Sequence, residues 1–226
     1  EQGHETMFVS EGAAMGLCRL RSFRKFMPNE KLWPPNEVWE ERMAGNPYAA
    51  VSSFTQRHEI GVTSLFGGAS GIEDFVKKSM MVHAELLRSQ LEFARAYPYN
   101  SGFMNWMYND IWGTGTWSLV DYYFDKKPAY YAMKRSGARQ AVEILLYENK
   151  TMAVVINDTE KPWKGTLVVR QELVDGAGLL KEIKKAITLA PFSQISIPLS
   201  LEEATDPAYL YATFDGKDCV YFYDLW

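Results

Sequence analysis

The spacing of apolar and polar positions changes near residue 140. Before this point apolar residues recur at helical spacing or gather in short runs, whereas after it they alternate in short segments separated by turn residues. This second region has about seven expected strands, a density that is typical of an immunoglobulin-like β-sandwich. Their expected ranges are 142–147, 152–157, 165–173, 179–189, 193–198, 208–214 and 218–223. The pattern therefore divides the chain into residues 1–140 and 141–226.

The first region contains a long amphipathic helical pattern. Ser70 and Glu73 have the spacing of a capping box, in which each side chain satisfies a free backbone N–H of the first turn. An apolar stripe with helical spacing follows over residues 72–94. We expect the helix to end at the pair 97–98, because proline disfavours helix in the residue before it.

Two short apolar runs flank this helix. Residues 7–9 are a strand candidate that opens into a loop, and residues 103–108 are a second one that ends in Asn-Asp. Residues 12–71 have weak periodicity and are expected to be irregular, while Pro128 can open a second helix. The order strand, long loop, helix, strand, loop, helix is the repeating unit of a parallel α/β fold. Such folds place their sites at the carboxyl ends of the strands.

Composition excludes several classes of protein. With 226 residues, of which 47% are hydrophobic and 23% charged, the chain can bury a core and is expected to be globular. Its formal net charge of −4 does not suit a nucleic-acid binder, which needs clustered Lys and Arg in excess to contact phosphates. Apolar runs in the sequence fall short of the roughly 18 to 20 residues of a membrane span, so we expect no membrane partner.

Cysteine and histidine usage predicts neither a disulfide framework nor a metal site. The two cysteines, Cys18 and Cys219, are too few for a disulfide scaffold. His4, His58 and His83 have no short ligand spacing, so we expect no metal and no cofactor. His83 falls on the apolar stripe, where a partly buried histidine with satisfied hydrogen bonds is expected.

Two stretches resemble segments of family-two glycoside hydrolases, the β-mannosidase branch in particular. "MFVSEG", followed by "RLRSFRKFMP", is similar to the segment around the catalytic nucleophile of that family. "GFMNWMYNDIWGTGTWSLVDYYFDKKPAYYAMKR" is similar to the last barrel strand of that branch and the helix after it. The resemblance implies an α/β plus all-β chain. Residues 1–140 would be the C-terminal part of a (β/α)8 TIM barrel, and residues 141–226 the immunoglobulin-like β-sandwich domain that follows it.

The resemblance also implies a retaining exo-glycosidase that acts on an oligosaccharide or glycan, with β-mannosidase as the favoured specificity. In that chemistry one carboxylate attacks the anomeric carbon and a second carboxylic acid protonates the leaving oxygen, the two groups lying roughly 5 to 5.5 Å apart. Glu11 aligns with the nucleophile, and Trp106 aligns with the aromatic floor of the sugar subsite. Asn109 and Asp110 are candidates for hydrogen bonds to sugar hydroxyls or for holding the loops around the pocket.

The sequence departs from the family in two respects. The family segment continues from its Ser-Glu pair with an aromatic residue and a glycine, whereas Gly-Ala-Ala-Met follows Glu11, which puts the sugar preference in doubt. The family's general acid lies on barrel strand four, and the residues before Glu11 contain no counterpart. A complete barrel needs about 250 residues. Together with a start at Glu1, without initiator methionine or leader, this predicts a processed chain or an excised piece that is inactive by itself.

Each candidate residue also has a structural interpretation. Without the resemblance, Glu11 would be a loop carboxylate or a helix cap, and Trp106 a core aromatic. Asn109 and Asp110 would close a turn through hydrogen bonds from side chain to backbone.

Other functions remain open at this point. The competing class is a non-catalytic carbohydrate-binding or assembly module, and β-glucosaminidase, β-galactosidase and β-glucuronidase are alternatives within the family. Basic residues in 19–25 (Arg19, Arg21, Arg24 and Lys25) and the pair Lys126-Lys127 are expected to lie on solvated faces. A barrel remnant would expose apolar strand edges, through which the chain could associate with itself.

Overall fold

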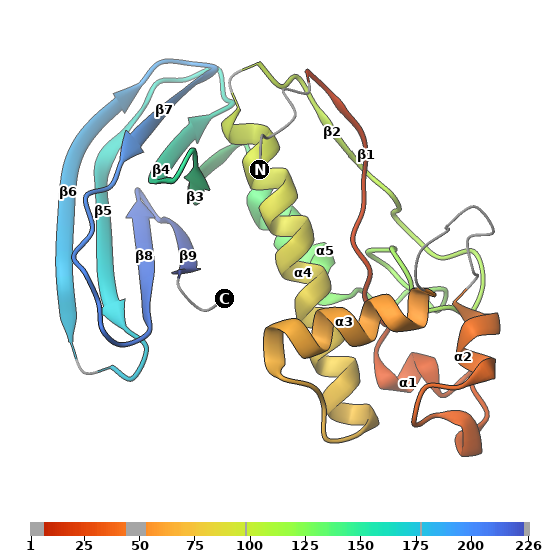
Figure 1. The fold of residues 1–226 in the computed structure, drawn as a ribbon. Helices are drawn as coiled ribbons and strands as arrows, with labels where there is room; N and C mark the ends of the chain where they lie inside the picture. The colour runs from red at the N-terminus through yellow and green to blue at the C-terminus, as the bar shows by residue number, and fades with distance from the viewer. Residues whose placement is uncertain (1–6, 44–52, 98, 177, 224–226) are drawn as a thin grey trace. The chain divides into compact units, whose positions relative to one another are not determined.

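The chain forms two compact units. The structure is a computed structural model that describes residues 7–43, 53–97, 99–176 and 178–223 (Figure 1). The first unit comprises Glu1–Ala94 and Tyr99–Lys134, and the second comprises Arg95–Pro98 and Arg135–Trp226. Helices and a parallel strand pair build the first unit, and antiparallel sheets build the second. His4 and Pro98, considered above, lie outside the described residues.

Strands β1 (Val9–Gly12) and β2 (Phe103–Asn105) pair in parallel in the first unit. They are joined in sequence by helical segments, as expected for a parallel α/β unit. The apolar run before β1 is not the buried strand that the sequence predicts, because Met7 is 73% and Phe8 45% exposed. The strand instead begins at Val9 and includes Glu11, so the expected range 7–9 is wrong by two residues at its start. The second strand is three residues shorter than expected at its end.

Residues 12–71 are more helical than their weak periodicity predicts. Three short helical segments occur there, α1 (Leu20–Phe23), the 3₁₀ turn η1 (Asn29–Lys31) and α2 (Glu37–Arg42), followed by the longer α3 (Phe54–Phe66). Ser53 caps α3, since its side chain accepts a hydrogen bond of 3.1 Å from the backbone N–H of Gln56. A glycine and two β-branched residues at 61–63 weaken the helical pattern of α3, which is why the sequence does not reveal it.

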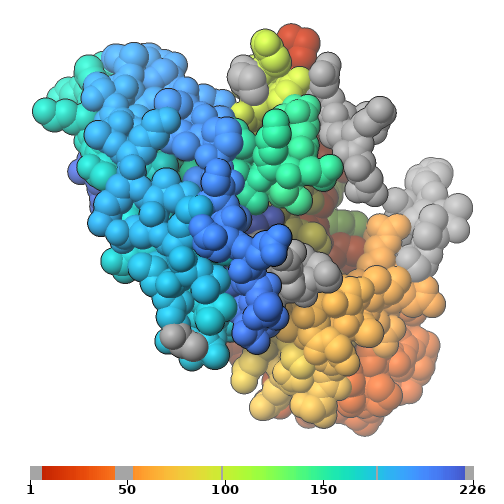
Figure 2. Space-filling model, turned by 60° about the vertical axis from the view of Figure 1, so that its left-hand side comes forward, coloured from red at the N-terminus to blue at the C-terminus, as the bar shows by residue number. Residues whose placement is uncertain are grey.

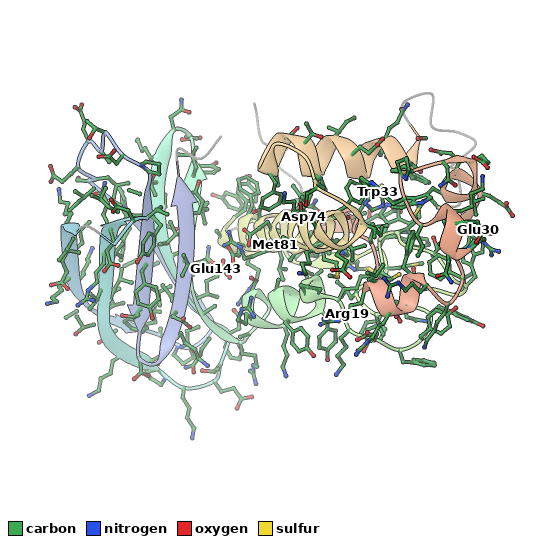
Figure 3. The ribbon with its side chains drawn as sticks, turned by 90° about the horizontal axis from the view of Figure 1, so that it is seen from below. Arg19, Glu30, Trp33, Asp74, Met81 and Glu143 are labelled. Carbon is green, nitrogen blue, oxygen red and sulfur yellow. The ribbon has the colours of Figure 1, made fainter. Side chains whose placement is uncertain are left out.

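Helix α4 (Ile72–Ala96) confirms the predicted amphipathic helix. The apolar stripe is buried over most of its length, at Phe75, Val76, Met80, His83, Leu87, Leu91 and Ala94. The cap differs from the prediction, because Asp74 rather than Glu73 reaches back and accepts hydrogen bonds from the backbone N–H and the hydroxyl of Ser70, at 2.9 and 3.2 Å. Met81 lies on the exposed face of the helix, and Figure 3 labels it together with Asp74.

An aromatic cluster packs against the beginning of α4. The ring of Phe75 lies 5.2 Å from that of Trp33 and 5.9 Å from that of Trp39, measured between centroids. Trp39 also packs edge-on against Phe23 of α1 at 4.9 Å. Such edge-on contacts contribute beyond the area that they bury. This cluster therefore ties the segments that follow β1 to the long helix.

Helix α5 (Pro128–Ser136) begins at the proline that the sequence predicts as its first residue. The lysine immediately before it is not on a solvated face. Lys127 is fully buried, and its ammonium donates hydrogen bonds of 2.9 Å to the Gly16 carbonyl and 3.1 Å to the Thr116 carbonyl. The expectation that Lys127 is solvated is therefore wrong, whereas Lys126 is exposed as expected.

Lys127 has one carboxylate partner, Asp110, whose Oδ2 lies 4.0 Å from the ammonium. The Ser118 hydroxyl also donates to this oxygen at 2.6 Å. Burial lowers the pKa of Lys127, and Asp110 opposes that shift. The buried charge is thus compensated by two carbonyls and one carboxylate that come from the segments following β1 and β2.

A second buried polar chain involves His58 of α3. Its Nε2 lies 2.9 Å from the Gly115 carbonyl, and its Nδ1 lies 3.0 Å from the Ser79 hydroxyl. A carbonyl only accepts, so Nε2 carries the proton and Nδ1 accepts from Ser79. The Ser79 oxygen in turn accepts from the Leu17 N–H at 3.1 Å. This arrangement requires a neutral imidazole, and burial lowers the pKa of His58 to about 4.

His83 differs from its sequence-based expectation. The prediction of a partly buried histidine is wrong, because His83 is fully buried. Its ring nitrogens lack a hydrogen-bond partner of good geometry among the described residues. The backbone of Trp117 nevertheless acts to raise the pKa of His83. Burial places the pKa of His83 well below its ordinary value, with Lys127 and His58 acting in the same direction.

The second unit consists of two antiparallel sheets. One has the order β3 (Gln140–Tyr147), β4 (Lys150–Asn157), β7 (Ser193–Pro198), and the other has the order β6 (Leu179–Leu189), β5 (Trp163–Leu173), β8 (Ala208–Phe214), β9 (Lys217–Tyr223). These seven described strands match the predicted ranges to within two residues at every boundary. Side chains of β5 and β6, coloured cyan to light blue, form much of the surface of this unit in Figure 2.

The buried face of both sheets supplies one apolar core. Alternate residues of the strands point into it, among them Ile144, Val155, Leu167, Leu210 and Phe214. The hairpin turns have the residues that the sequence predicts: Glu148-Asn149 and Asp215-Gly216 all adopt positive φ, as two-residue hairpin loops require. Local turn chemistry and short apolar segments between the turns therefore define this unit.

A buried carboxylate in the second unit is neutralised by the arginine at the end of α4. Glu143 of β3, labelled in Figure 3, is buried, and its Oε1 lies 3.2 Å from Nη1 of Arg95. The same guanidinium contacts Asp158 at 2.8 Å and donates to the Ser136 carbonyl. These contacts explain why residues 95–98 belong to the second unit.

Lys127→Met should destabilise the chain by about 3 to 5 kcal/mol, because it leaves the Asp110 carboxylate buried without its countercharge. The matched control is Lys126→Met, which removes an exposed ammonium 4.7 Å from the Tyr130 ring and should cost at most about 1 kcal/mol. Urea unfolding of both variants measures the difference. Adding Asp110→Asn to Lys127→Met should recover part of the lost stability. If Lys127→Met is as stable as Lys126→Met, the buried pair of Lys127 and Asp110 does not have this role.

The free energy of unfolding should fall as the pH is lowered from about 6.5 to 4. In this window the unfolded state binds a proton at His58 that the native state rejects, so stability is lost on acidification by up to about 3 kcal/mol from this group. His58→Gln removes this contribution, and its stability should depend less steeply on pH. Denaturant unfolding at a series of pH values gives both slopes, and superimposable slopes would contradict the neutral buried histidine.

Candidate active site

The residues predicted as nucleophile and sugar platform lie at the carboxyl ends of the two parallel strands. Glu11 is the third residue of β1, and Trp106 follows directly after β2. The backbone N–H of Trp106 donates to the Gly12 carbonyl at 2.8 Å, which fixes the position of Trp106 next to the end of β1. The peptide bond between Trp106 and Met107 is cis.

Strand register places these two residues next to each other at the end of the strand pair. Gly12 pairs with Asn105, and both Glu11 and Trp106 are one residue away from that pair. The register shifts between Val9 and Gly12, so side chains do not alternate regularly between faces over this stretch. Both are exposed, Trp106 at 50%. A carboxylate and an indole ring are thus presented together to solvent.

Position 12 requires a glycine because the ring of Phe103 lies close to its backbone. A Cβ built on Gly12 would lie 2.1 Å from the ring of Phe103, far inside any permitted contact. The ring of Phe103 therefore covers the backbone directly after Glu11. The departure from the family pattern at this position has a local packing reason.

Asn109 and Asp110 have different environments. Asn109 is exposed, and its amide donates to the Asp110 carbonyl at 3.2 Å. Asp110 is buried, with its carboxylate held by Ser118 and Lys127. Burial raises the pKa of Asp110, while Lys127 and Ser118 oppose this shift. The geometry favours the loop-holding role for Asp110 over the sugar-binding one, and leaves Asn109 available to a ligand.

A pocket of about 630 Å³ opens beside these two residues. Its walls come from the loops after β1 and β2 and are formed by Lys25, Asn109, Asp110, Ile111, Tyr122, Tyr123 and Phe124. The four predicted site residues therefore form two pairs. Glu11 and Trp106 meet at the strand ends, while Asn109 and Asp110 line the pocket.

Sequence reasoning misses the roles of the basic residues around this pocket. Arg21, Arg24 and Lys25 are exposed as expected, and Arg19 is half-buried. The Nε atoms of Arg19 and Arg21 lie 3.4 and 2.6 Å from the carboxylate of Asp125. The ammonium of Lys25 lies 4.3 Å from the centroid of the Tyr123 ring. The nearest sequence signal is the interleaving of basic and aromatic residues over 19–26, which by itself does not identify their partners.

The described residues contain no group of three or more His, Cys, Asp or Glu side chains that could hold a metal ion. In the described part of the chain, no helix combines the length and the apolar character needed to cross a bilayer.

Comparison with known proteins places this geometry among glycosidases. No family model matches the chain. It is 26% identical to an exo-β-D-glucosaminidase of Streptomyces avermitilis over 198 residues, which is 84% of this chain and 21% of that enzyme. It is also 26% identical to the exo-β-D-glucosaminidase of Hypocrea jecorina, over 90% of this chain and 24% of that enzyme. A shorter match, 32% identical over 79 residues, relates it to β-mannosidase B of Thermothelomyces thermophilus, covering 32% of this chain and 9% of that enzyme.

Solved structures share the fold of the chain. The β-D-mannosidase of Dictyoglomus thermophilum superposes with a TM-score of 0.81 at 23% identity, covering 96% of this chain and 27% of that one. The exo-chitosanase of Amycolatopsis orientalis gives 0.77 at 20% identity, covering 95% and 27%. The chain spans about a fifth to a quarter of the length of the first curated relatives. The chain is thus similar over most of its length to part of the exo-β-D-glucosaminidases, and it shares its fold with part of the β-D-mannosidase and the exo-chitosanase.

Proposed function

We propose that the chain is part of a retaining exo-β-glycosidase in which Glu11 is the catalytic nucleophile and Trp106 the floor of the sugar subsite. The observation that carries this proposal is their placement at the carboxyl ends of adjacent parallel strands, one residue from the pair Gly12 and Asn105. In this proposal residues 1–140, which include the first unit, are the end of a (β/α)8 barrel. Residues 141–226, which make up most of the second unit, are the immunoglobulin-like sandwich.

The chemistry assigns a distinct task to each side chain. The Glu11 carboxylate attacks the anomeric carbon, forming a glycosyl ester as the bond to the leaving oxygen breaks, and a protonated carboxylic acid gives its proton to that oxygen. Water then hydrolyses the ester and regenerates Glu11. The resemblance assigns the acid to a position upstream of this chain, so the activity is proposed for the protein that combines this chain with the rest of such an enzyme.

The aromatic platform and the nucleophile act on the same sugar. The exposed indole of Trp106 offers a flat apolar face that suits the C–H face of a hexose, and its backbone bond to Gly12 holds it next to Glu11. This pairing supports a catalytic site better than it supports a non-catalytic binding module. In a binding module a carboxylate would only accept hydrogen bonds from sugar hydroxyls, whereas in a retaining glycosidase it also attacks the anomeric carbon.

Two sugar specificities are supported by different observations. The "WMYNDIW" motif and the fold of the Dictyoglomus enzyme favour β-mannosidase. The relatives that align with most of the chain are named exo-β-D-glucosaminidases and favour that specificity. We propose β-mannosidase as the first candidate and exo-β-glucosaminidase as the second, and parallel assays on aryl β-mannoside and aryl β-glucosaminide distinguish them.

Glu11→Gln should lower kcat of the full-length enzyme on an aryl β-glycoside by on the order of 10³ or more, because the amide cannot form the glycosyl ester. The fold should be unaffected, since Glu11 is exposed at the end of β1. Glu30→Gln, at an exposed glutamate of η1 labelled in Figure 3, is the matched control and should keep normal kcat. A Glu11→Gln enzyme with unchanged kcat would exclude Glu11 as the nucleophile.

Trp106→Ala should lower kcat/KM on the same substrate by about 10- to 100-fold, the loss expected for removing an aromatic contact of about 1.5 to 3 kcal/mol. Phe192→Ala in the second unit removes another exposed aromatic side chain and should leave kcat/KM unchanged. Steady-state kinetics of the full-length variants measures both effects. If both variants retain full kcat/KM, Trp106 is not part of the sugar subsite.

A further inference from the structure

The pocket beside Asn109 lies within reach of the proposed catalytic residues. Asn109 is three residues after Trp106, and three peptide units span at most about 11 Å. That is the length of about two sugar residues. Tyr108, which lies between Trp106 and Asn109 in sequence, and Ile111 of the pocket wall are both exposed. The pocket is therefore a neighbour of the strand ends and not a separate feature of the fold.

The far wall of the pocket is a tightly held turn. Oδ1 of Asp121 accepts hydrogen bonds of 2.9 Å from the backbone N–H groups of Tyr123 and Asp125. Between these residues Phe124 adopts a φ of 62° and is 84% exposed. A bulky side chain in the left-handed region is costly and is retained where the surrounding structure fixes it, commonly at functional sites. The turn thus presents an aromatic ring at the rim of the pocket.

The charged residues among those that line the pocket are Asp110 and Lys25. Asp110 is compensated by Lys127, and nearby Asp125 contacts Arg19 and Arg21. Figure 3 shows Arg19 at the start of α1. Lys25 forms no ion pair with a described carboxylate and lies over the ring of Tyr123. Among the described lining residues, Lys25 therefore presents a positive charge to the pocket without a carboxylate partner.

We propose that this pocket binds the sugar on the leaving-group side of the scissile bond, and that Lys25 makes it select a neutral or acidic sugar over a protonated amino sugar. The assignment of the pocket to the leaving-group side of the scissile bond rests on the proposed function. An exo-acting enzyme holds the terminal sugar at its nucleophile, so a further sugar subsite nearby lies on the leaving-group side. Aromatic rims with an amide and an ammonium inside suit a polyhydroxylated ring, which offers C–H faces and hydroxyl groups together.

The charge of Lys25 bears on the choice between the two specificities of the relatives. A glucosamine unit carries an ammonium group near neutral pH, and two like charges in one pocket repel each other. Oligomers of glucosamine would place that ammonium on the leaving-group side at every cleavage. A neutral hexose or a uronic acid meets no such repulsion.

The test uses disaccharides that share the terminal sugar that the full-length enzyme cleaves and differ only in the second sugar. The second sugar is a neutral hexose, the corresponding 2-amino sugar, or a uronic acid. The readout is the ratio of kcat/KM for the neutral leaving sugar to kcat/KM for the amino leaving sugar. We expect a ratio of about three to ten for the unmodified enzyme, the range expected for one partly screened like-charge contact.

Lys25→Glu should reverse the preference, and Lys25→Gln should bring the ratio close to one. Lys126→Gln removes the equivalent lysine over Tyr130, outside the pocket wall, and should leave the ratio unchanged. A ratio that is the same in Lys25→Glu as in the unmodified enzyme would overturn the proposal, even where aryl glycosides are hydrolysed normally and the proposed function stands.

Failure of the proposed function gives a different result. If no β-glycoside is hydrolysed while Glu11 is intact, the pocket is tested by NMR titration of the 226-residue chain with the neutral and the amino disaccharide. The proposal requires saturable shifts of Asn109 and Tyr122 with the neutral disaccharide and weaker binding of the amino disaccharide, with the order reversed in Lys25→Glu. Absence of these shifts would overturn it.

Discussion

The ammonium of Lys127 is the interaction on which the geometry of the first unit depends. It is fully buried and bonds to the carbonyls of Gly16 and Thr116, and it faces the carboxylate of Asp110. Gly16 belongs to the segment after β1, while Asp110 and Thr116 belong to the loop after β2. Strands β1 and β2 share only a short parallel ladder. The contacts of the Lys127 ammonium therefore help to hold together the loops that follow these two strands. A buried charge of this kind is costly unless every partner is in place, which makes the arrangement of the loops specific.

The proposed site is a consequence of that constraint. The Trp106 backbone bonds to Gly12, and the loop that continues from Trp106 to Phe124 forms the pocket wall. With the loop fixed by Lys127 and by the neutral His58, the carboxylate of Glu11 and the indole of Trp106 lie at neighbouring strand ends and are both exposed. The rigid polar groups therefore lie beneath the site, and the groups that would meet a substrate remain accessible, as preorganised binding requires.

The parts of the fold that are encoded locally could be predicted from the sequence. Short apolar segments between turn residues define β3 to β9, and an apolar stripe defines α4, so both were predicted close to their observed bounds. Lys127 could not be predicted, because Lys126 beside it has the same local context and only partners distant in sequence bury the one and not the other. Glu11 and Trp106 were identified by family resemblance, and their pairing across parallel strands followed from the α/β pattern. The ion pairs of Arg19 and Arg21 with Asp125 join residues that are far apart in sequence, so no local pattern contains them.

The central claim is that Glu11 forms the covalent bond to the sugar. The most direct measurement treats the full-length enzyme with a 2-deoxy-2-fluoro glycoside, whose glycosyl-enzyme ester hydrolyses slowly, and locates the label by peptide mass spectrometry. The account predicts one sugar per chain, attached to Glu11 in the peptide that contains β1. A label on another carboxylate, with the Glu11 peptide unmodified and activity lost, would contradict it.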